Sequence, residues 1–457
     1  MKQNTIYNKA LKLAVPMMIQ NGITNAVGLV DNVMVGSLGT EAMTAVSIVG
    51  QLIFVFNLAI FGGLSGPTIY GAQYFGQKNE EGFRNIFRLK WWIGMICLIG
   101  GLIVFLSCGS GLISLYLHGS DSGIDAVLTK SYGLEYMQVM LFGLLPFVVT
   151  QIYAGSLRET GQSIQPMVAG ICSVFVDILL NYLLIYGKFG CPRLGVKGAA
   201  IATVAARIVE MSVIVIWSHA RKDRHTFLRK IYSTMRIPKD MVCMVVKKGL
   251  PIFLNEFLWS GGIAVLTQCY STRGLTVVAG LNISNVLCNL LNVVFIALGG
   301  AVGILIGQLL GASLYEQAKK DSIRLMWFTG AVCTILTVIL VGISGVFPKV
   351  YDTSIQVQRL GQYFIVITAL FFPLQGFLNS LYFTLRSGGK TVVTFLFDSV
   401  FTWVIPVPVA FLLCRFSALP ILAVYTIVQS MDFIKVVIGY YLIKKGVWIT
   451  NLVEEIS

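Results

Sequence analysis

Charged residues are scarce in this chain of 457 residues. Only 12% of them are Asp, Glu, Lys or Arg, whereas 56% are hydrophobic and the mean hydropathy is +0.80. A soluble domain carries about 25% charged residues. The scarcity of charge therefore excludes an ordinary soluble globular protein and predicts one that lies in a membrane.

Residues that build metal, redox or nucleotide sites are also few. The nine cysteines form no CxxC pair, which excludes the common zinc and disulfide frameworks. The chain has three histidines, all expected in loops or at span ends, and it lacks the GxxxxGK[ST] phosphate loop. We therefore expect no cofactor and no enzyme activity, and active transport would have to draw on an ion gradient or a partner subunit.

Long apolar stretches are what the chain has in abundance. A helix needs about 20 apolar residues to span a bilayer, and twelve stretches meet this length. They are Leu13–Met34, Val46–Tyr70, Trp91–Cys108, Tyr136–Tyr153, Met167–Tyr186, Gly198–Trp217, Leu250–Leu266, Val277–Leu310, Met326–Val346, Tyr363–Phe383, Val392–Leu413 and Leu419–Tyr441. Such lengths exclude the short alternating strands of a membrane barrel. The sequence predicts an all-α integral membrane protein with twelve transmembrane helices, because the backbone must satisfy its own hydrogen bonds in lipid.

The chain also repeats itself. Pro16, Gly39 and Gln73 recur 235 positions later as Pro251, Gly274 and Gln308, and further matches recur 228 positions later. Two repeated bundles are a common design of secondary transporters. We expect an N-terminal six-helix bundle over residues 1–218, a basic cytoplasmic linker over 219–248 and a C-terminal six-helix bundle over 249–457.

The positions of the basic residues predict the orientation. Lys and Arg favour cytoplasmic loops, and the segment His219–Lys248 alone carries nine of them. Both termini are therefore expected on the cytoplasmic side of the plasma membrane, although Lys188, Arg193 and Lys197 would then face outward. The net charge of +14 is spread over loops rather than gathered on one face, which argues against a nucleic-acid partner.

Four polar residues of the first half are candidates for an ion-coupling site. Asp31 lies near the outer end of the first span, Asp177 and Asn181 share one face of the fifth, and Thr203 lies about one turn into the sixth. Charged groups inside a membrane are costly and mark functional sites. Two carboxylates, an amide oxygen and a hydroxyl suit Na⁺ or a proton, and the alternative is a structural hydrogen-bond cluster.

The second half offers a different set of acids. Glu256 and Asp398 lie near the inner ends of their spans and could form a substrate site or a second cation site. Asp432 and Lys435 are three residues apart on the last span, so we expect them to pair structurally. Arg207 and Glu210 have the same spacing, and we interpret them in the same way.

Over nearly its whole length, the sequence resembles the multidrug and toxin extrusion (MATE) family of cation-coupled exporters. The residues that carry the resemblance are Pro16, Asp31 to Gly36, Leu38, Gly39, Ala45, Gln73, Gly76, the run Gly187 to Thr203, Gly249 to Pro251, Glu256 and Leu385 to Thr391.

The resemblance implies two six-helix bundles that form a V, and export of cationic or amphipathic small molecules in exchange for Na⁺ or H⁺. It also implies that Asp31 and Thr203 bind the coupling cation. Well-studied members carry Asn and then Asp on the fifth span, whereas this chain carries Asp177 and then Asn181. The order is reversed, which moves the charge about 6 Å along the helix. Glu256 is also similar to an acid that some members use.

Other functions remain as alternatives. A lipid-linked glycan flippase of the same superfamily would need a basic cavity, yet the spans carry acids and almost no Arg or Lys. A channel would need a filter or a ring of charge, and a membrane enzyme would need clustered catalytic groups; neither pattern is present. The predicted partners are membrane lipid and small-molecule substrates, and we expect a monomer.

Overall fold

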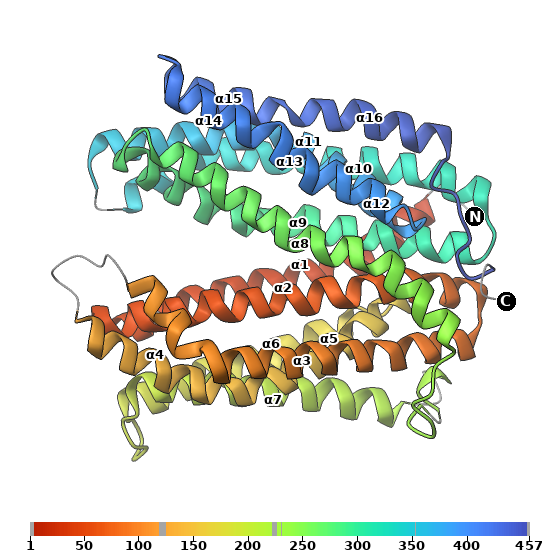
Figure 1. The fold of residues 1–457 in the computed structure, drawn as a ribbon, viewed down its shortest axis with the longest axis horizontal. Helices are drawn as coiled ribbons and strands as arrows, with labels where there is room; N and C mark the ends of the chain where they lie inside the picture. The colour runs from red at the N-terminus through yellow and green to blue at the C-terminus, as the bar shows by residue number, and fades with distance from the viewer. Residues whose placement is uncertain (1–3, 118–124, 222–225, 230, 352, 455–457) are drawn as a thin grey trace. The chain divides into compact units, whose positions relative to one another are not determined.

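The computed structural model describes residues 4–117, 125–221, 226–229, 231–351 and 353–454. All regular elements in this described part are helices, and twelve segments are long and apolar enough to cross a membrane. The predicted fold class, an all-α membrane protein with twelve spans, is confirmed (Figure 1).

The helices of the first half are mostly continuous. They are α1 Asn4–Gly36, α2 Thr40–Gln77, α3 Glu80–Leu117, α4 Ala126–Met140, η1 Leu141–Gly143, α5 Leu144–Glu159, α6 Ile164–Tyr186, α7 Gly195–Ala220 and η2 Thr226–Leu228. The elements α4, η1 and α5 form one span, Ala126–Glu159. Helices extend well beyond the apolar stretches: the stretch Trp91–Cys108 lies inside the 38-residue helix α3. An apolar window detects only the part of a helix that lipid can surround.

The second half begins with long helices and ends with broken ones. They are α8 Lys239–Ser271, α9 Leu275–Gly311, α10 Tyr315–Ser344, η3 Phe347–Val350, α11 Ile355–Ser387, α12 Thr391–Phe395, the π-helical segment η4 Leu396–Val400, α13 Phe401–Val404, α14 Pro406–Phe416, α15 Ile421–Ser430 and α16 Asp432–Lys445. The last two spans, Thr391–Phe416 and Ile421–Lys445, are thus each made of several segments.

The chain packs into two compact units. The first-half unit comprises Ile19–Gly71 and Glu80–Val242, and the second-half unit comprises Met1–Met18, Ala72–Asn79 and Cys243–Ser457. The start of α1 and the end of α2 therefore pack with helices of the second half. The units defined by packing therefore differ from the halves defined by the sequence repeat at these two segments. The domain limits expected from the repeat stay a prediction.

Glycines at the repeated positions make the turns between the first two helices of each half. Gly39 has a φ of +122° and Gly274 a φ of +121°, a region that other residues rarely adopt. Gly39 joins α1 to α2 and Gly274 joins α8 to α9. The repeat seen in the sequence is therefore a repeat of backbone conformation.

The basic segment after α7 packs on α3 within the first-half unit. Arg84 Nε donates to the carbonyl of Phe227 at 3.4 Å, and Arg88 Nε to that of Ile231 at 3.0 Å. One turn further along α3, Trp92 Nε1 donates to the carbonyl of another residue of the segment, at 3.1 Å. Donors spaced four apart on one helix face thus hold an irregular backbone whose carbonyls need partners. The linker is anchored where the structure describes it.

Candidate functional site

The four polar residues predicted for the first half come together in the first-half unit. Asp31 lies on α1, Asp177 and Asn181 on α6 and Thr203 on α7. Asn181 Nδ2 donates to Asp31 Oδ1 at 2.8 Å. The Asp177 carboxylate lies near Asp31 and Thr203, and the Thr203 hydroxyl donates to the carbonyl of Ala199 at 3.2 Å. Asp177 is 6% exposed and Asn181 1%, whereas Asp31 and Thr203 are partly exposed, so the α6 side of the cluster is buried.

Local sequence explains how α7 brings Thr203 to α6. Helix α6 ends at Gly187, whose φ of +66° is a left-handed cap. The chain returns through Gly198, where an added Cβ would lie 2.8 Å from the carbonyl oxygen of Leu184. Only glycine permits this approach of α7 to α6. Thr203 lies five residues beyond Gly198 on α7 and comes near Asp177.

Tyr136 completes the cluster, and sequence reasoning missed it. It lies on α4, is 8% exposed, and lies near Thr203. Asp31 and Asp177 are close enough to act on it electrostatically. A single tyrosine in an apolar stretch gives no charge signal, and only the packing of α4 on α7 brings it here.

Two oxygen atoms of the cluster have no hydrogen-bond donor among the described residues. They are Oδ1 of Asp177 and Oδ1 of Asn181, both fully buried. Buried polar atoms nearly always have a partner, so each exception calls for an explanation. Carboxylate, amide, hydroxyl and phenol oxygens are hard ligands of the kind that alkali cations prefer, and a carboxylate can also take a proton. Such a set of oxygen atoms is of the chemical type that a small cation or a proton requires.

A second polar layer in the first-half unit links α1 to α5 and α7. Arg158 Nη2 donates to Gln20 Oε1 at 2.8 Å, and Gln20 Nε2 donates to Glu210 Oε1 at 3.5 Å. Arg207 donates to the carbonyl of Gly143 at 3.3 Å. Arg207 and Glu210 were expected to pair with each other, but their hydrogen bonds go to other helices. Side chains three apart can point at different neighbours when both sides of the helix are packed.

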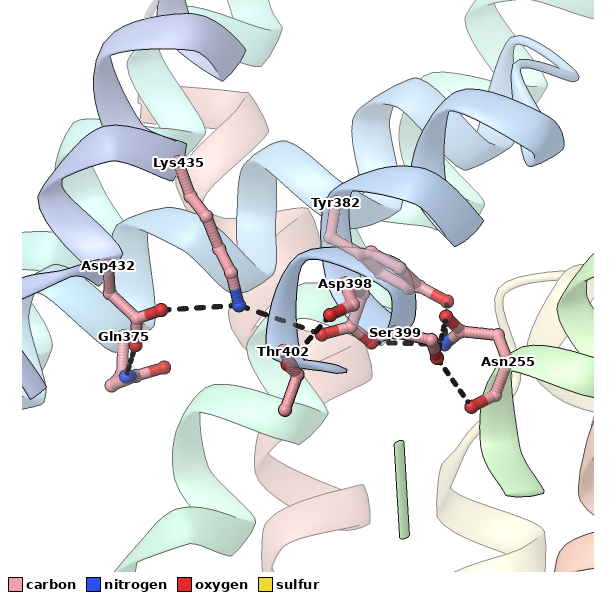
Figure 2. Close-up of polar contacts among 8 residues, drawn as sticks. All are labelled: Asn255, Gln375, Tyr382, Asp398, Ser399, Thr402, Asp432 and Lys435. Atoms are coloured by element: carbon pink, nitrogen blue, oxygen red, sulfur yellow. Dashed lines mark hydrogen bonds and ion pairs between the residues drawn. The ribbon is translucent and has the colours of Figure 1, made fainter. Parts of the chain in front are cut away.

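The second-half unit holds its own polar cluster around Asp398 (Figure 2). Asn255 Nδ2 donates to Asp398 Oδ2 at 3.0 Å, and Lys435 Nζ lies 3.9 Å from Asp398 Oδ1. Lys435 Nζ also lies 3.2 Å from Asp432 Oδ1, as the spacing predicted. Glu256 lies within electrostatic reach of Asp398 in the same unit. Lys435, which was expected to pair with Asp432, therefore also lies close to Asp398.

Both helices of this cluster are broken close to their charged residues. Asp398 lies in the π-helical segment η4, and α16 begins at Asp432 after an interruption at Met431. Pro406 follows Ile405, where α13 gives way to α14. π-bulges are frequent at functional sites, and interrupted helices mark binding sites of transporters.

Comparison with known proteins identifies the family. The MatE family model matches residues 16–183 and 251–412, which is most of the chain and covers both halves. The chain belongs to the MatE family. The family resemblance predicted from the sequence is confirmed, and the MatE chain is a membrane transporter rather than an enzyme.

Individual relatives agree with this membership. "Probable multidrug resistance protein YoeA" of Bacillus subtilis is 26% identical over 96% of this MatE chain and 94% of the relative. "Probable multidrug resistance protein NorM" of Thermotoga maritima is 23% identical over 92% and 88%. A solved outward-facing multidrug resistance MATE family transporter is 20% identical, has a TM-score of 0.82 and covers 96% of both chains, which supports the fold.

Proposed function

We propose that the chain is a cation-coupled antiporter that exports cationic and amphipathic small molecules across the plasma membrane by alternating access. Both termini would lie on the cytoplasmic side. Family membership supports transport of small molecules, since several relatives are named multidrug resistance proteins. The coupling ion, Na⁺ or H⁺, would bind at Asp31, Asp177, Asn181 and Thr203, with Tyr136 beside them.

The observation that carries the proposal is the pair of buried acceptors without donors, Asp177 Oδ1 and Asn181 Oδ1, next to Asp31. A hydrogen-bond cluster that serves structure alone would satisfy these atoms. Two carboxylates in a shielded site repel each other unless a cation or a proton lies between them. Binding of a cation or a proton at this site would therefore be favourable, because it would relieve this repulsion.

Coupling requires that the ion and the substrate favour different conformations. Helix α1 is suited to transmit this preference, because it carries Asp31 in the first-half unit while its first residues pack in the second-half unit. Binding of an ion at Asp31 would remove the repulsion from Asp177 and change the preferred position of α1. Glu256 and Asp398 stay candidates for a substrate site or second cation site.

The test uses the purified chain in proteoliposomes with Na⁺ and pH gradients imposed separately. We expect one of the gradients to drive movement of a fluorescent organic cation, with counter-movement of the ion. Asp31→Asn and Asp177→Asn should each reduce the driven rate about tenfold or more, since a hydrogen bond to a charged group contributes about 1.5–3 kcal/mol. Asp240→Asn, at an exposed acid near the start of α8, is the matched control and should leave the rate unchanged.

Full gradient-coupled export by both Asp31→Asn and Asp177→Asn would contradict the assignment of the coupling site. Absence of counter-ion movement in the parent chain would contradict antiport itself. A flippase of the same superfamily would leave the fluorescent organic cation unmoved, because its substrate is a lipid-linked glycan.

A further inference from the structure

The cluster around Lys435 differs from a simple ion pair, because one ammonium group serves two carboxylates (Figure 2). Lys435 Nζ lies 3.2 Å from Asp432 Oδ1 and 3.9 Å from Asp398 Oδ1. The side chains are 12%, 16% and 25% exposed for Lys435, Asp432 and Asp398. Two negative charges and one positive charge leave a net charge of −1 at a partly shielded position.

The other oxygen of each carboxylate is held by an amide. Asn255 Nδ2 donates to Asp398 Oδ2 at 3.0 Å, and Gln375 Nε2 donates to Asp432 Oδ2 at 2.6 Å. Asn255 is itself oriented by Ser399 Oγ, which donates to Asn255 Oδ1 at 2.6 Å. The two carboxylates are thus fixed by second partners and present their Oδ1 atoms to the same ammonium group.

The ammonium group also lies over an aromatic ring. Lys435 Nζ is 4.9 Å from the centre of the Phe401 ring, within the range of a cation–π interaction. Carboxylate oxygens and an aromatic face together are the usual components of a site for an organic ammonium ion. The distance of 3.9 Å to Asp398 Oδ1 exceeds hydrogen-bonding range, so the lysine leaves this oxygen available to another donor.

The repeat shows which part of the cluster is special to the second half. Lys435 lies 228 positions after Arg207, the offset of the later repeated residues. Arg207 likewise lies over a ring, that of Phe147, at 5.1 Å. However, the first-half position that matches Asp432 is Val204. A basic residue over an aromatic ring belongs to both halves, whereas the carboxylate three residues before it is found only in the second.

We propose that Asp398, Asp432 and the Phe401 ring form a binding subsite for primary alkylammonium groups, and that Lys435 is its tethered occupant. A substrate carrying a primary ammonium group on an unbranched chain takes the subsite by displacing Lys435. Such a group has three N–H donors, as lysine has, and can reach both Oδ1 atoms. A quaternary ammonium ion has no N–H donor and cannot replace these contacts.

The interruptions in these helices allow the two carboxylates to move relative to Lys435. Asp398 lies in the π-helical segment and Asp432 begins α16 after the break at Met431. A segment with interrupted hydrogen bonding can shift without unwinding a complete helix. This subsite rests on the proposed function, because it deepens the substrate class of the transporter.

The test is a chemical rescue of the purified full chain in detergent. Lys435→Ala removes the atoms that propylammonium would restore, and 1-propanol has the same heavy-atom shape without charge. We expect the melting temperature of Lys435→Ala to fall and propylammonium chloride to raise it again, whereas 1-propanol and tetramethylammonium chloride do not. Asp398→Asn introduced into Lys435→Ala should remove the rescue. Lys444→Ala, at an exposed lysine of the same helix, should show no response.

Calorimetric titration measures the competition by the lysine. Propylammonium should bind Lys435→Ala at least about tenfold more tightly than the parent chain, because a tethered group competes at a high effective concentration, on the order of millimolar or above. If Lys435→Ala does not fold, Lys435→Ala combined with Asp432→Asn keeps the net charge at −1 and should still bind propylammonium through Asp398.

Equal affinity of the parent and the Lys435 variants for propylammonium would overturn the proposal, as would a rescue that survives Asp398→Asn. This readout uses no ion gradient. If propylammonium binds but no ion-coupled export is measured, the proposed antiport is refuted and the subsite stands. If export is measured but Lys435→Ala binds propylammonium no more tightly than the parent chain, the subsite is refuted and the antiport stands.

Discussion

Gly76 of α2 lies against the backbone of Gln308 in α9, so closely that an added Cβ would be 2.0 Å from the Gln308 carbonyl oxygen. The reciprocal contact is present: a Cβ at Gly311 would lie 1.9 Å from the carbonyl oxygen of Gln73. Gln73 and Gly76 are the residues that recur as Gln308 and Gly311. The repeated motif of each half thus packs on the same motif of the other, within the second-half unit.

Alanine at either glycine should separate the two helix ends. We expect Gly76→Ala and Gly311→Ala each to lower the free energy of unfolding by about 1–3 kcal/mol, the usual cost of overpacking, because backbone atoms cannot rotate away. Thermal unfolding of the purified chain measures the effect. Gly100→Ala, where no atom lies within 4 Å of the added Cβ, is the control and should be neutral or stabilising. Equal melting temperatures for all three variants would contradict the close contact.

Gln73 binds the carboxyl-terminal segment to the contact between α2 and α9 through hydrogen bonds. Its Nε2 donates to the carbonyls of Ser387 at 2.8 Å and Thr450 at 3.3 Å, and its Oε1 accepts from the amide of Leu452 at 2.8 Å. Gln73 is 0% exposed, so these backbone groups have little access to water.

Gln73→Ala should therefore loosen the segment from Trp448 to Glu454. Each backbone group left without a partner costs about 1–3 kcal/mol, so we expect faster amide hydrogen exchange in this segment and a lower melting temperature. Gln356→Ala, at an exposed glutamine near the start of α11, should change neither. Unchanged exchange in Gln73→Ala would show that the segment is held by its apolar contacts alone.

Lys90 and Glu159 form a buried ion pair in the first-half unit. Lys90 Nζ lies 2.5 Å from Glu159 Oε1, and the side chains are 1% and 0% exposed. Removal of one partner leaves an unpaired buried charge, which costs about 3–5 kcal/mol. We expect Lys90→Met and Glu159→Gln each to destabilise strongly and the double variant to recover most of the loss.

A double-mutant cycle measured by unfolding tests this pair. Arg324 and Asp321 supply the comparison, because Arg324 is 40% exposed and their distance is 3.2 Å. Arg324→Ala should cost less than Lys90→Met, because water reaches the Arg324 side of this pair although Asp321 is only 5% exposed. Additive effects of Lys90→Met and Glu159→Gln would be inconsistent with direct coupling.

Tyr136 should affect ion coupling without affecting the fold. Tyr136→Phe keeps the ring packed on α7 and removes only the hydroxyl beside Thr203. We expect gradient-driven export to fall by about threefold to tenfold, because losing one polar contact to the bound ion costs about 1 kcal/mol, at an unchanged melting temperature. Tyr116→Phe, at a 55% exposed tyrosine, should retain the parent rate. Parent-like export by Tyr136→Phe would exclude the phenol from the coupling site.

The sequence predicted the helices better than it predicted their ends. Each of the twelve predicted apolar stretches coincides with one candidate span, but Met326–Val346 runs two residues past the end of its helix and Leu419–Tyr441 begins two residues before its own. In the other direction, α2 and α3 extend beyond their stretches by several residues at both ends. These helix ends have polar or mixed sequences and are stabilised by packing, as at Gly76. A search for apolar stretches therefore cannot predict them. The breaks of the last two spans were not predicted either, although Pro406 marks one of them.

The partners of charged side chains show the same limit. Spacing along a single helix predicted the contact of Asp432 with Lys435, which is 3.2 Å long. The same rule was only partly right for Arg207 and Glu210, which attract each other electrostatically while their hydrogen bonds go to Gly143 and Gln20. A neighbour on another helix competes with the residue one turn away, and the sequence of one helix says nothing of that neighbour.

The sequence by itself determined that this chain crosses a membrane twelve times as helices, because lipid offers the backbone no other partner for its hydrogen bonds. It also determined that the two halves repeat and which polar residues lie within spans. Only the tertiary structure decided that Asn181 donates to Asp31, that Tyr136 joins them, and that Lys435 lies between two carboxylates. The reason is that helices apolar on every side can pack in many rotations and depths, and close packing among all of them selects one.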